Sequence, residues 1–126
     1  MKRQIVVTDL MPKAIGPYSQ AVWAGDLLFS AGQIALDPAT GTMVPGGITE
    51  QTARVLDNIR GLLKSQGLDF RNVVKTTVFL SDMNNFTVMN ETYASYFTID
   101  PPARATVQAA RLPKDALVEI EFVAAR

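Results

Sequence analysis

The chain has 126 residues, 48% of them hydrophobic and 19% charged, and its 12 basic side chains balance 12 acidic ones. These totals predict one folded domain, residues 1–126, and give no electrostatic reason to expect a nucleic acid or an anionic membrane as a partner. Cysteine and histidine are both absent, which excludes disulfides, thiol nucleophiles, His-based triads and metal sites built on either residue.

The N-terminal segment has a weak likeness to a signal peptide. Lys2 and Arg3 supply the positive start, but Thr8, Asp9 and Pro12 interrupt the sequence before an apolar region of sufficient length forms. No apolar run approaches the roughly 18 residues of a membrane span. We therefore expect a cytoplasmic protein with no membrane partner.

The first forty residues are predicted to form short strands. Residues 5–7 are β-branched, and the apolar runs 21–23 and 27–30 flank Gly25-Asp26, which suits a hairpin turn. A helix is expected next, with Thr49 as its N-cap and Gly67 as its C-terminal stop. Its apolar stripe recurs at helical spacing and consists of Ala53, Leu56, Ile59 and Leu63.

Residues 73–80 form the strongest predicted strand, because five of them are Val or Thr and no helix breaker or turn residue interrupts them. A second helix should follow, capped by Asp82 or Asn84, with a stripe of Phe86, Met89, Tyr93 and Phe97. Two final strands are expected over 103–111 and 117–124. This mixture predicts an α+β fold in which a sheet carries two helices packed on one face.

Alternation along the last two strands suggests a functional face. If the strands pair as a hairpin, matching their apolar faces places Arg104, Thr106, Glu119 and Glu121 together on the other side of the sheet. That side also carries apolar residues, so we expect it to be covered by another subunit. A simpler alternative is a cross-strand Arg–Glu ion pair that only solvates the sheet.

The segment 102–121, PARATVQAARLPKDALVEIE, closely resembles the signature of the RidA family, also called YjgF. Segments 15–21 (IGPYSQA), 31–34 (AGQI) and 74–80 (VKTTVFL) resemble further motifs of that family in the same order. The resemblance implies a chorismate-mutase-like α+β fold, a homotrimer with a central β-barrel, and small clefts between subunits. It also implies a deaminase that hydrolyses 2-iminoacids and their enamine tautomers to 2-ketoacids and ammonia, without a cofactor or a metal.

The resemblance assigns roles to individual residues. Arg104 matches the clamp for the substrate carboxylate, and Glu119 matches the residue that holds the attacking water and manages protons. Thr106 stands where a backbone carbonyl shares that water, and Gly32 would offer its backbone N–H to the substrate carboxylate. A Gly alone predicts only a bulge or a close contact in a strand.

Two further residues would bind substrate according to the same resemblance. Tyr18 would wall the pocket with its ring, and Asn90 sits where the family has a recurrent Asn near the cleft. The simpler alternatives are a packed turn aromatic for Tyr18 and a solvated helix residue for Asn90. The sequence departs from the family at Ala31, where a Ser is usual, and in a shorter connection over 97–102.

A different class of function fits some of the same features. A non-catalytic trimer that binds small carboxylates, or a regulator or chaperone of other proteins, would use Arg104 but not Glu119. A nuclease is disfavoured by the zero net charge and by the absence of His and of an acidic metal cluster.

Overall fold

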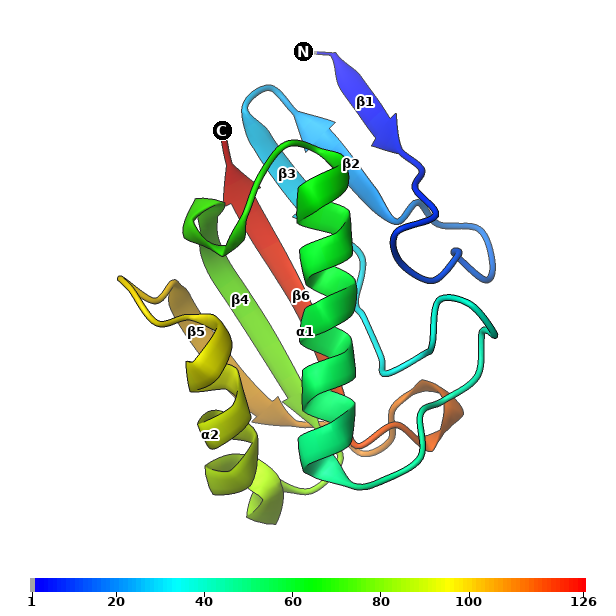
Figure 1. Ribbon diagram of the computed structural model, residues 1–126, viewed down its shortest axis with the longest axis vertical. Coiled ribbons are helices and arrows are strands. Elements are labelled where there is room, and N and C mark those ends of the chain that lie inside the picture. The colour runs from blue at the N-terminus through cyan, green and yellow to red at the C-terminus, as the bar shows by residue number, and fades with distance from the viewer. Residues whose placement is uncertain (1) are drawn as a thin grey trace.

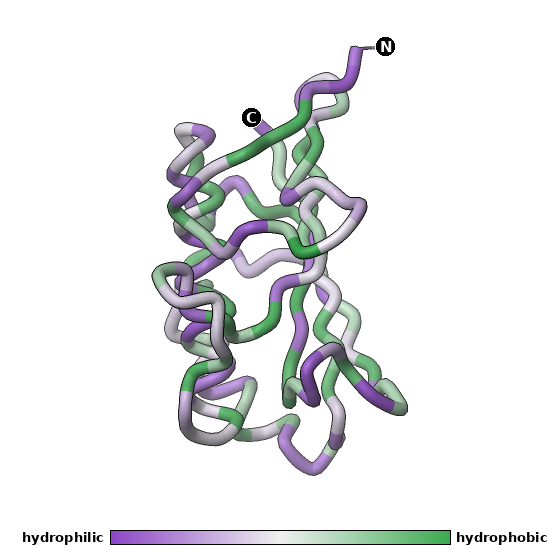
Figure 2. Tube along the Cα trace, turned by 90° about the vertical axis from the view of Figure 1, so that its right-hand side faces the viewer, coloured by the Kyte–Doolittle hydropathy of each residue, from purple (hydrophilic) through white to green (hydrophobic). Residues whose placement is uncertain are grey.

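The computed structural model describes residues 2–126 as a mixed six-stranded sheet with two helices on one of its faces. Figure 1 views the molecule from the helix side, and Figure 2, turned by 90°, shows the helices and the sheet as two layers. The strands are β1 (Arg3–Val6), β2 (Ala21–Ala24), β3 (Leu27–Ser30), β4 (Val73–Leu80), β5 (Ala103–Gln108) and β6 (Val118–Ala125), and the helices are α1 (Ile48–Ser65) and α2 (Phe86–Tyr96). The predicted α+β class with both helices on one face is confirmed.

The strand order is β1-β2-β3-β6-β4-β5, so the C-terminal strand lies in the middle of the sheet. β2 and β3 form the predicted hairpin, and Gly25 adopts the positive φ of 60° that its tight turn requires. β6 is antiparallel to both of its neighbours, whereas β4 and β5 are parallel. A parallel pair needs a crossover connection, and α2 provides it.

The core lies between the sheet and the two helices. α1 is amphipathic and turns Val55, Leu56, Ile59, Leu62 and Leu63 inward, all at most 1% exposed. The N-cap of α1 is Gly47 rather than Thr49, and its amide donates to the side chain of Glu50 at 2.8 Å. Asp82 caps a 3₁₀ turn before α2, with Asn85 in the N-cap position of the helix itself.

The predicted hairpin between the last two strands is wrong. β4 lies between β5 and β6 and pairs with both of them. The nine-residue connection 109–117, which includes a 3₁₀ turn over Pro113–Asp115, carries the chain past β4 instead of reversing it beside β5. Parallel pairing of β5 is set by its long-range contact with β4, which the local alternation of the sequence does not encode.

The faces of β5 are consequently the reverse of those predicted. Val107 is 44% exposed on the face that no helix covers, while Arg104 and Thr106 are half-buried on the side of α2. In β6, by contrast, Val118, Ile120 and Phe122 are buried against the helices, as the alternation predicts. Small apolar residues can therefore mark an exposed strand face as well as a core.

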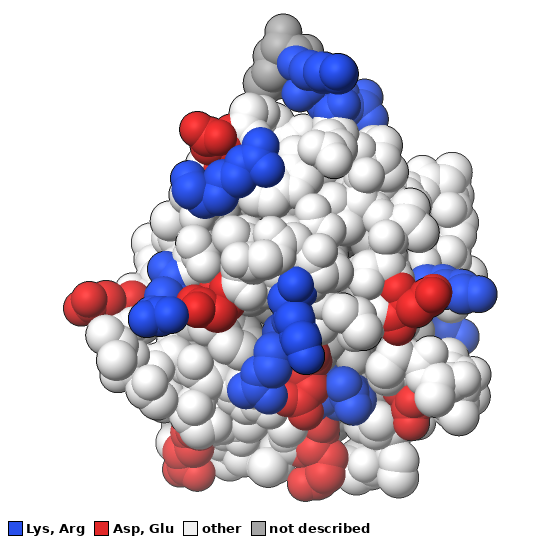
Figure 3. Space-filling model, turned by 45° about the horizontal axis from the view of Figure 1, so that its top comes forward, with Lys and Arg blue, Asp and Glu red and all other residues white. Residues whose placement is uncertain are grey.

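The surface carries charges of both signs. Figure 3 shows Lys and Arg interspersed with Asp and Glu on the face in view, with broad uncharged areas between them. In the described part of the chain, no three His, Cys, Asp or Glu side chains gather into a group that is suited to a metal ion. Neither helix of residues 2–126 combines the length and the apolar character needed to cross a bilayer.

Candidate active site

The six predicted site residues form two groups, whose charged members Arg104 and Glu119 lie on opposite sides of the sheet. Arg104 reaches toward α2 on the helix-covered face, whereas Glu119 alternates with the buried residues of β6 and faces the uncovered side. We call Asn90, Arg104 and Thr106 the Arg104 group, and Tyr18, Gly32 and Glu119 the Glu119 group. Within one protomer the sheet separates Arg104 and Thr106 from Glu119, so the prediction that these three residues share a face is wrong.

Glu119 lies directly over Gly32. The backbone of Gln33 bridges that of Ile120 through two hydrogen bonds of 2.8 and 3.0 Å, which brings the segment after β3 alongside β6. Between the Phe29–Val123 pair and this bridge, four residue steps on one strand match three on the other, so the strand bulges at 30–32. A Cβ on Gly32 would overlap Oε2 of Glu119. The sequence predicted either a bulge or a close contact at Gly32, and the structure shows both.

The environment of Glu119 favours its protonated form. Partial burial raises the pKa of its carboxyl group above the ordinary value, and the negative charge of Glu121 raises it further. A carboxyl group whose pKa moves toward neutrality is suited to both accepting and returning a proton. The chemistry available at this point of the sheet is thus general acid–base catalysis.

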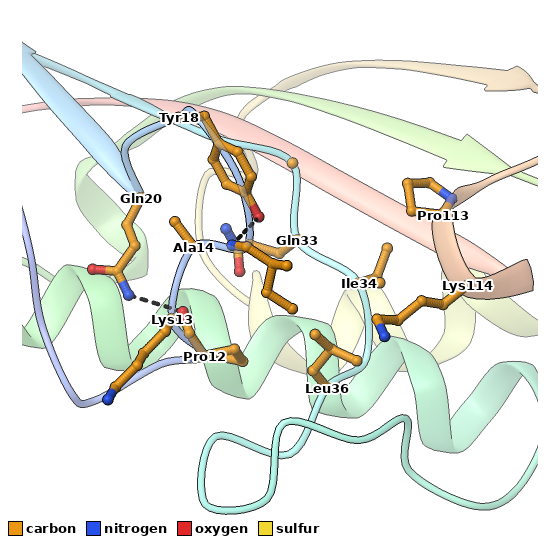
Figure 4. Close-up of a pocket in the computed structure, with 12 residues that line it drawn as sticks. Pro12, Lys13, Ala14, Tyr18, Gln20, Gln33, Ile34, Leu36, Pro113 and Lys114 are labelled. Carbon is orange, nitrogen blue, oxygen red and sulfur yellow. Dashed lines mark hydrogen bonds between the residues drawn. The ribbon is translucent and has the colours of Figure 1, made fainter.

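Tyr18 lies on the rim of a cavity of about 270 Å³ that also includes Gly32 (Figure 4). Its side chain is 51% exposed, and its hydroxyl oxygen accepts a hydrogen bond from the amide of Ile15 at 3.1 Å. The bond to Ile15 is local to the turn, so the alternative of a turn aromatic stays open beside the substrate-binding prediction. Ile34, Leu36 and Lys114 line the opposite side of the cavity.

Gln20 is a supporting residue that sequence reasoning missed. It is 4% exposed, and its amide nitrogen donates to the carbonyl oxygens of Thr8 and Pro12, while its amide oxygen accepts from the Thr8 amide. These bonds fix the loop that carries Tyr18, and Figure 4 shows the one to Pro12. A single Gln beside a Tyr gives no local signal of this role, because its partners lie 8 and 12 residues away.

Arg104 lies over aromatic rings and, among the described residues 2–126, has no carboxylate partner. Its Cζ is 4.8 Å from the ring centroid of Tyr93 and 5.6 Å from that of Phe86, both on α2. The ion pairs within residues 2–126 involve Arg60, Arg71, Arg111 and Arg126. The alternative of an Arg104–Glu119 ion pair is therefore wrong.

Asn90 and Thr106 each present a buried polar atom without a hydrogen-bond partner in the described part of the chain. The atoms are Oδ1 of Asn90 and Oγ1 of Thr106. Asn90 and Arg104 line one cavity of about 460 Å³ between α2 and the residues that precede β5, including Pro101 and Pro102. Unpaired polar atoms are costly inside a protein, and those beside a cavity mark places where a ligand or water supplies the missing bond.

Comparisons with known proteins place these features in a family. Residues 8–126 match the family model described as endoribonuclease L-PSP. A RutC family protein of Pyrococcus horikoshii is 52% identical over 97% of each chain, and the mouse 2-iminobutanoate/2-iminopropanoate deaminase is 49% identical over 97% of this chain and 90% of its own. The crystal structure of Escherichia coli TdcF with bound serine has a TM-score of 0.93 and 40% identity, with 98% of both chains covered.

Proposed function

Because this chain belongs to the endoribonuclease L-PSP family, which includes the RutC and RidA (YjgF) proteins, we propose that it hydrolyses reactive 2-iminoacids and enamines. The products would be the corresponding 2-ketoacid and ammonia. Four mammalian relatives, at 48–49% identity, carry the name 2-iminobutanoate/2-iminopropanoate deaminase. That degree of identity over nearly the whole chain supports the same reaction class.

The observation that carries this proposal is the half-buried carboxyl group of Glu119 above Gly32. Its raised pKa suits a group that must take a proton from water and later give one to a leaving amine. Gly32 leaves the space that the carboxylate occupies. Both features suit the hydrolysis of a C=N bond, and neither is needed for binding a carboxylate.

Arg104 would hold the substrate through its carboxylate. The planar guanidinium matches a carboxylate with two parallel hydrogen bonds, which a Lys does not reproduce. Asn90 lines the same cavity, and its buried Oδ1 has no hydrogen-bond partner within residues 2–126. The serine bound to TdcF is a small molecule with a carboxylate of the kind that Arg104 would clamp.

The separation of the two groups supports a cleft between subunits. Within a protomer Arg104 and Glu119 lie on opposite sides of the sheet, so one substrate would contact both if two copies meet across their surfaces. The uncovered sheet face exposes Leu27, Phe29 and Val107, which suits burial in a homotrimer built around a central barrel.

The chemical steps follow from these positions. Arg104 fixes the carboxylate, which orients the imine carbon toward the water held by Glu119. Glu119 takes a proton from that water as the oxygen bonds to the imine carbon. The same carboxyl group returns that proton to nitrogen, which gives a carbinolamine. Glu119 then carries the hydroxyl proton to the amine, the C–N bond breaks as the oxygen forms the C=O of the ketoacid, and ammonia leaves. Tyr18 and Thr106 would border the cleft without exchanging protons.

The test measures ketoacid and ammonia release from imines generated in place by an amino-acid oxidase or a threonine dehydratase. We expect acceleration by the wild type, its loss in Arg104→Ala and Glu119→Gln, and its retention in Arg71→Ala, which removes an exposed ion-paired arginine. Absence of acceleration across small and bulky imines by a folded protein would refute the deaminase proposal.

A second candidate is a non-enzymatic protein that binds small carboxylates. The serine in TdcF and the unpaired Arg104 are its support. The two functions differ in the need for Glu119. A Glu119→Gln protein that still binds 2-ketoacids but no longer turns over imines favours the enzyme, whereas binding without any wild-type turnover favours the second candidate.

A further inference from the structure

Three arginines lie over aromatic rings in this structure, and they differ in their charge partners. Arg60 stacks on Phe70 and Tyr96 and pairs with Asp57 at 3.0 Å. Arg126 stacks on Trp23 and pairs with Asp26 at 3.4 Å.

Arg104 lies over Phe86 and Tyr93 and, within residues 2–126, pairs with no carboxylate. A cation–π contact holds the guanidinium charge near the rings without an anionic partner. Arg104 is therefore held beside two rings, and no carboxylate of the described residues occupies its N–H donors.

Tyr93 is held in place by burial, by a hydrogen bond and by ring packing. It is 5% exposed, its hydroxyl is hydrogen-bonded to Oγ1 of Thr76 at 2.7 Å, and its ring packs on Phe97 with centroids 4.6 Å apart. Thr76 is 1% exposed and is the register partner of Arg104 across the parallel β4–β5 pair. The helix α2, the inner strand β4 and the edge strand β5 are therefore in contact with one another at the position of Arg104.

We propose that Phe86 and Tyr93 are positioning residues that orient Arg104 to receive a planar carboxylate in two parallel hydrogen bonds. We call these two rings the aromatic seat. A long side chain on an edge strand otherwise samples many rotamers, and this freedom must be lost when a ligand binds. Because the seat restricts the Arg104 side chain before a ligand arrives, less rotamer freedom is lost on binding. The seat therefore contributes to affinity for the carboxylate and not to the proton transfers at Glu119. The inference rests on the proposed function for the identity of the ligand.

The kinetic test compares three changes in the seat. Tyr93→Leu removes the ring, Tyr93→Phe keeps the ring but removes the bond to Thr76, and Phe86→Leu removes the second ring from a partly buried position. We expect KM for the imine and the Kd for 2-oxobutanoate to rise roughly ten-fold in Tyr93→Leu and a few-fold in Phe86→Leu, with kcat nearly unchanged. Tyr93→Phe should restore values close to those of the wild type.

Tyr96→Leu is the matched control. It removes a ring of the same kind from the same helix, but that ring stacks on Arg60. A loss of general helix stability would affect Tyr96→Leu and Tyr93→Leu alike, whereas positioning of Arg104 affects only the latter. Equal KM values in these two variants, or a fall in kcat without a rise in KM for Tyr93→Leu, would overturn the inference.

An NMR measurement separates this inference from the proposed function. Ring currents should shift the Nε–H resonance of Arg104 upfield in the wild type and in Tyr93→Phe, and the shift should shrink in Tyr93→Leu. Arg104→Ala assigns the resonance. An absent shift overturns the seat even if imines are hydrolysed. An upfield shift in the wild type, together with weaker 2-oxobutanoate binding by Tyr93→Leu, supports the seat even if the wild type turns over no imine.

Discussion

Glu119 combines two influences that raise its pKa, and they are separable by mutation. Burial is the larger cause and the charge of Glu121 the smaller. Removing a neighbouring negative charge makes ionisation easier, so Glu121→Gln should lower the pKa of Glu119 without returning it to the ordinary value. In the proposed mechanism the ionised form of Glu119 accepts the proton, so we expect kcat/KM to rise with pH through this pKa.

We therefore predict that Glu121→Gln moves the acid limb of the kcat/KM profile to lower pH. The profile is measured as the difference between imine decay with and without protein, with the imine-generating enzyme in excess at every pH. Asp26→Asn, which removes a carboxylate at the β2–β3 turn, should leave the limb in place. An acid limb that stays at the same pH or moves to higher pH in Glu121→Gln would contradict the role of Glu119.

Gly32 provides a second test at the scale of single residues. Gly32→Ala puts a methyl group where Oε2 of Glu119 lies, and a flexible carboxylate end moves more easily than the backbone. We expect the free energy of unfolding to change by less than about 1 kcal/mol and kcat/KM to fall by about 100-fold. In a Glu119→Gln background the same change should have little further effect, since the displaced group is already inactive. Additive losses would mean that Gly32 acts independently of Glu119.

At the scale of elements, α1 supports the loop that carries Tyr18. A Cβ on Gly61 would overlap the carbonyl oxygen of Leu10, so the helix and the N-terminal segment approach closely there. Gly61→Ala gains up to about 1 kcal/mol in helix propensity. Its added methyl group, however, forces the backbone of α1 away from the backbone of Leu10. We predict a net loss of about 1–3 kcal/mol in the free energy of unfolding, observed as a lower Tm in thermal denaturation. Lys64→Ala, on the exposed side of the same helix, should leave Tm nearly unchanged; a higher Tm in Gly61→Ala would contradict the close approach.

Elements defined by local patterns were predictable from the sequence. The β2–β3 hairpin, α1 and the strand β4 follow from turn residues, a 3.6-residue period and β-branched composition. The pairing of β5 was not predictable, because its partner β4 lies beyond an intervening helix and its alternation of Ala with polar residues fits either face. The roles of Arg104 and Glu119 came from the resemblance to a family, whereas the aromatic seat and Gln20 depend on contacts between distant segments.

At the scale of the whole molecule, the sheet separates Arg104 from Glu119 within one protomer, which makes the assembly testable by mixing. If each cleft takes Arg104 from one subunit and Glu119 from its neighbour, Arg104→Ala and Glu119→Gln proteins are inactive alone but complementary together. Random reassembly of an equal mixture leaves both residues intact in roughly a quarter of the clefts. We therefore predict recovery of roughly a quarter of wild-type imine hydrolysis after the two variants are unfolded and refolded together, and none when they are refolded separately. Sedimentation of the mixture tests whether it forms the proposed trimers. A fully assembled mixture without activity would place both residues of each cleft in the same subunit, and the protomer would then have to rearrange on assembly to bring them to one side of its sheet.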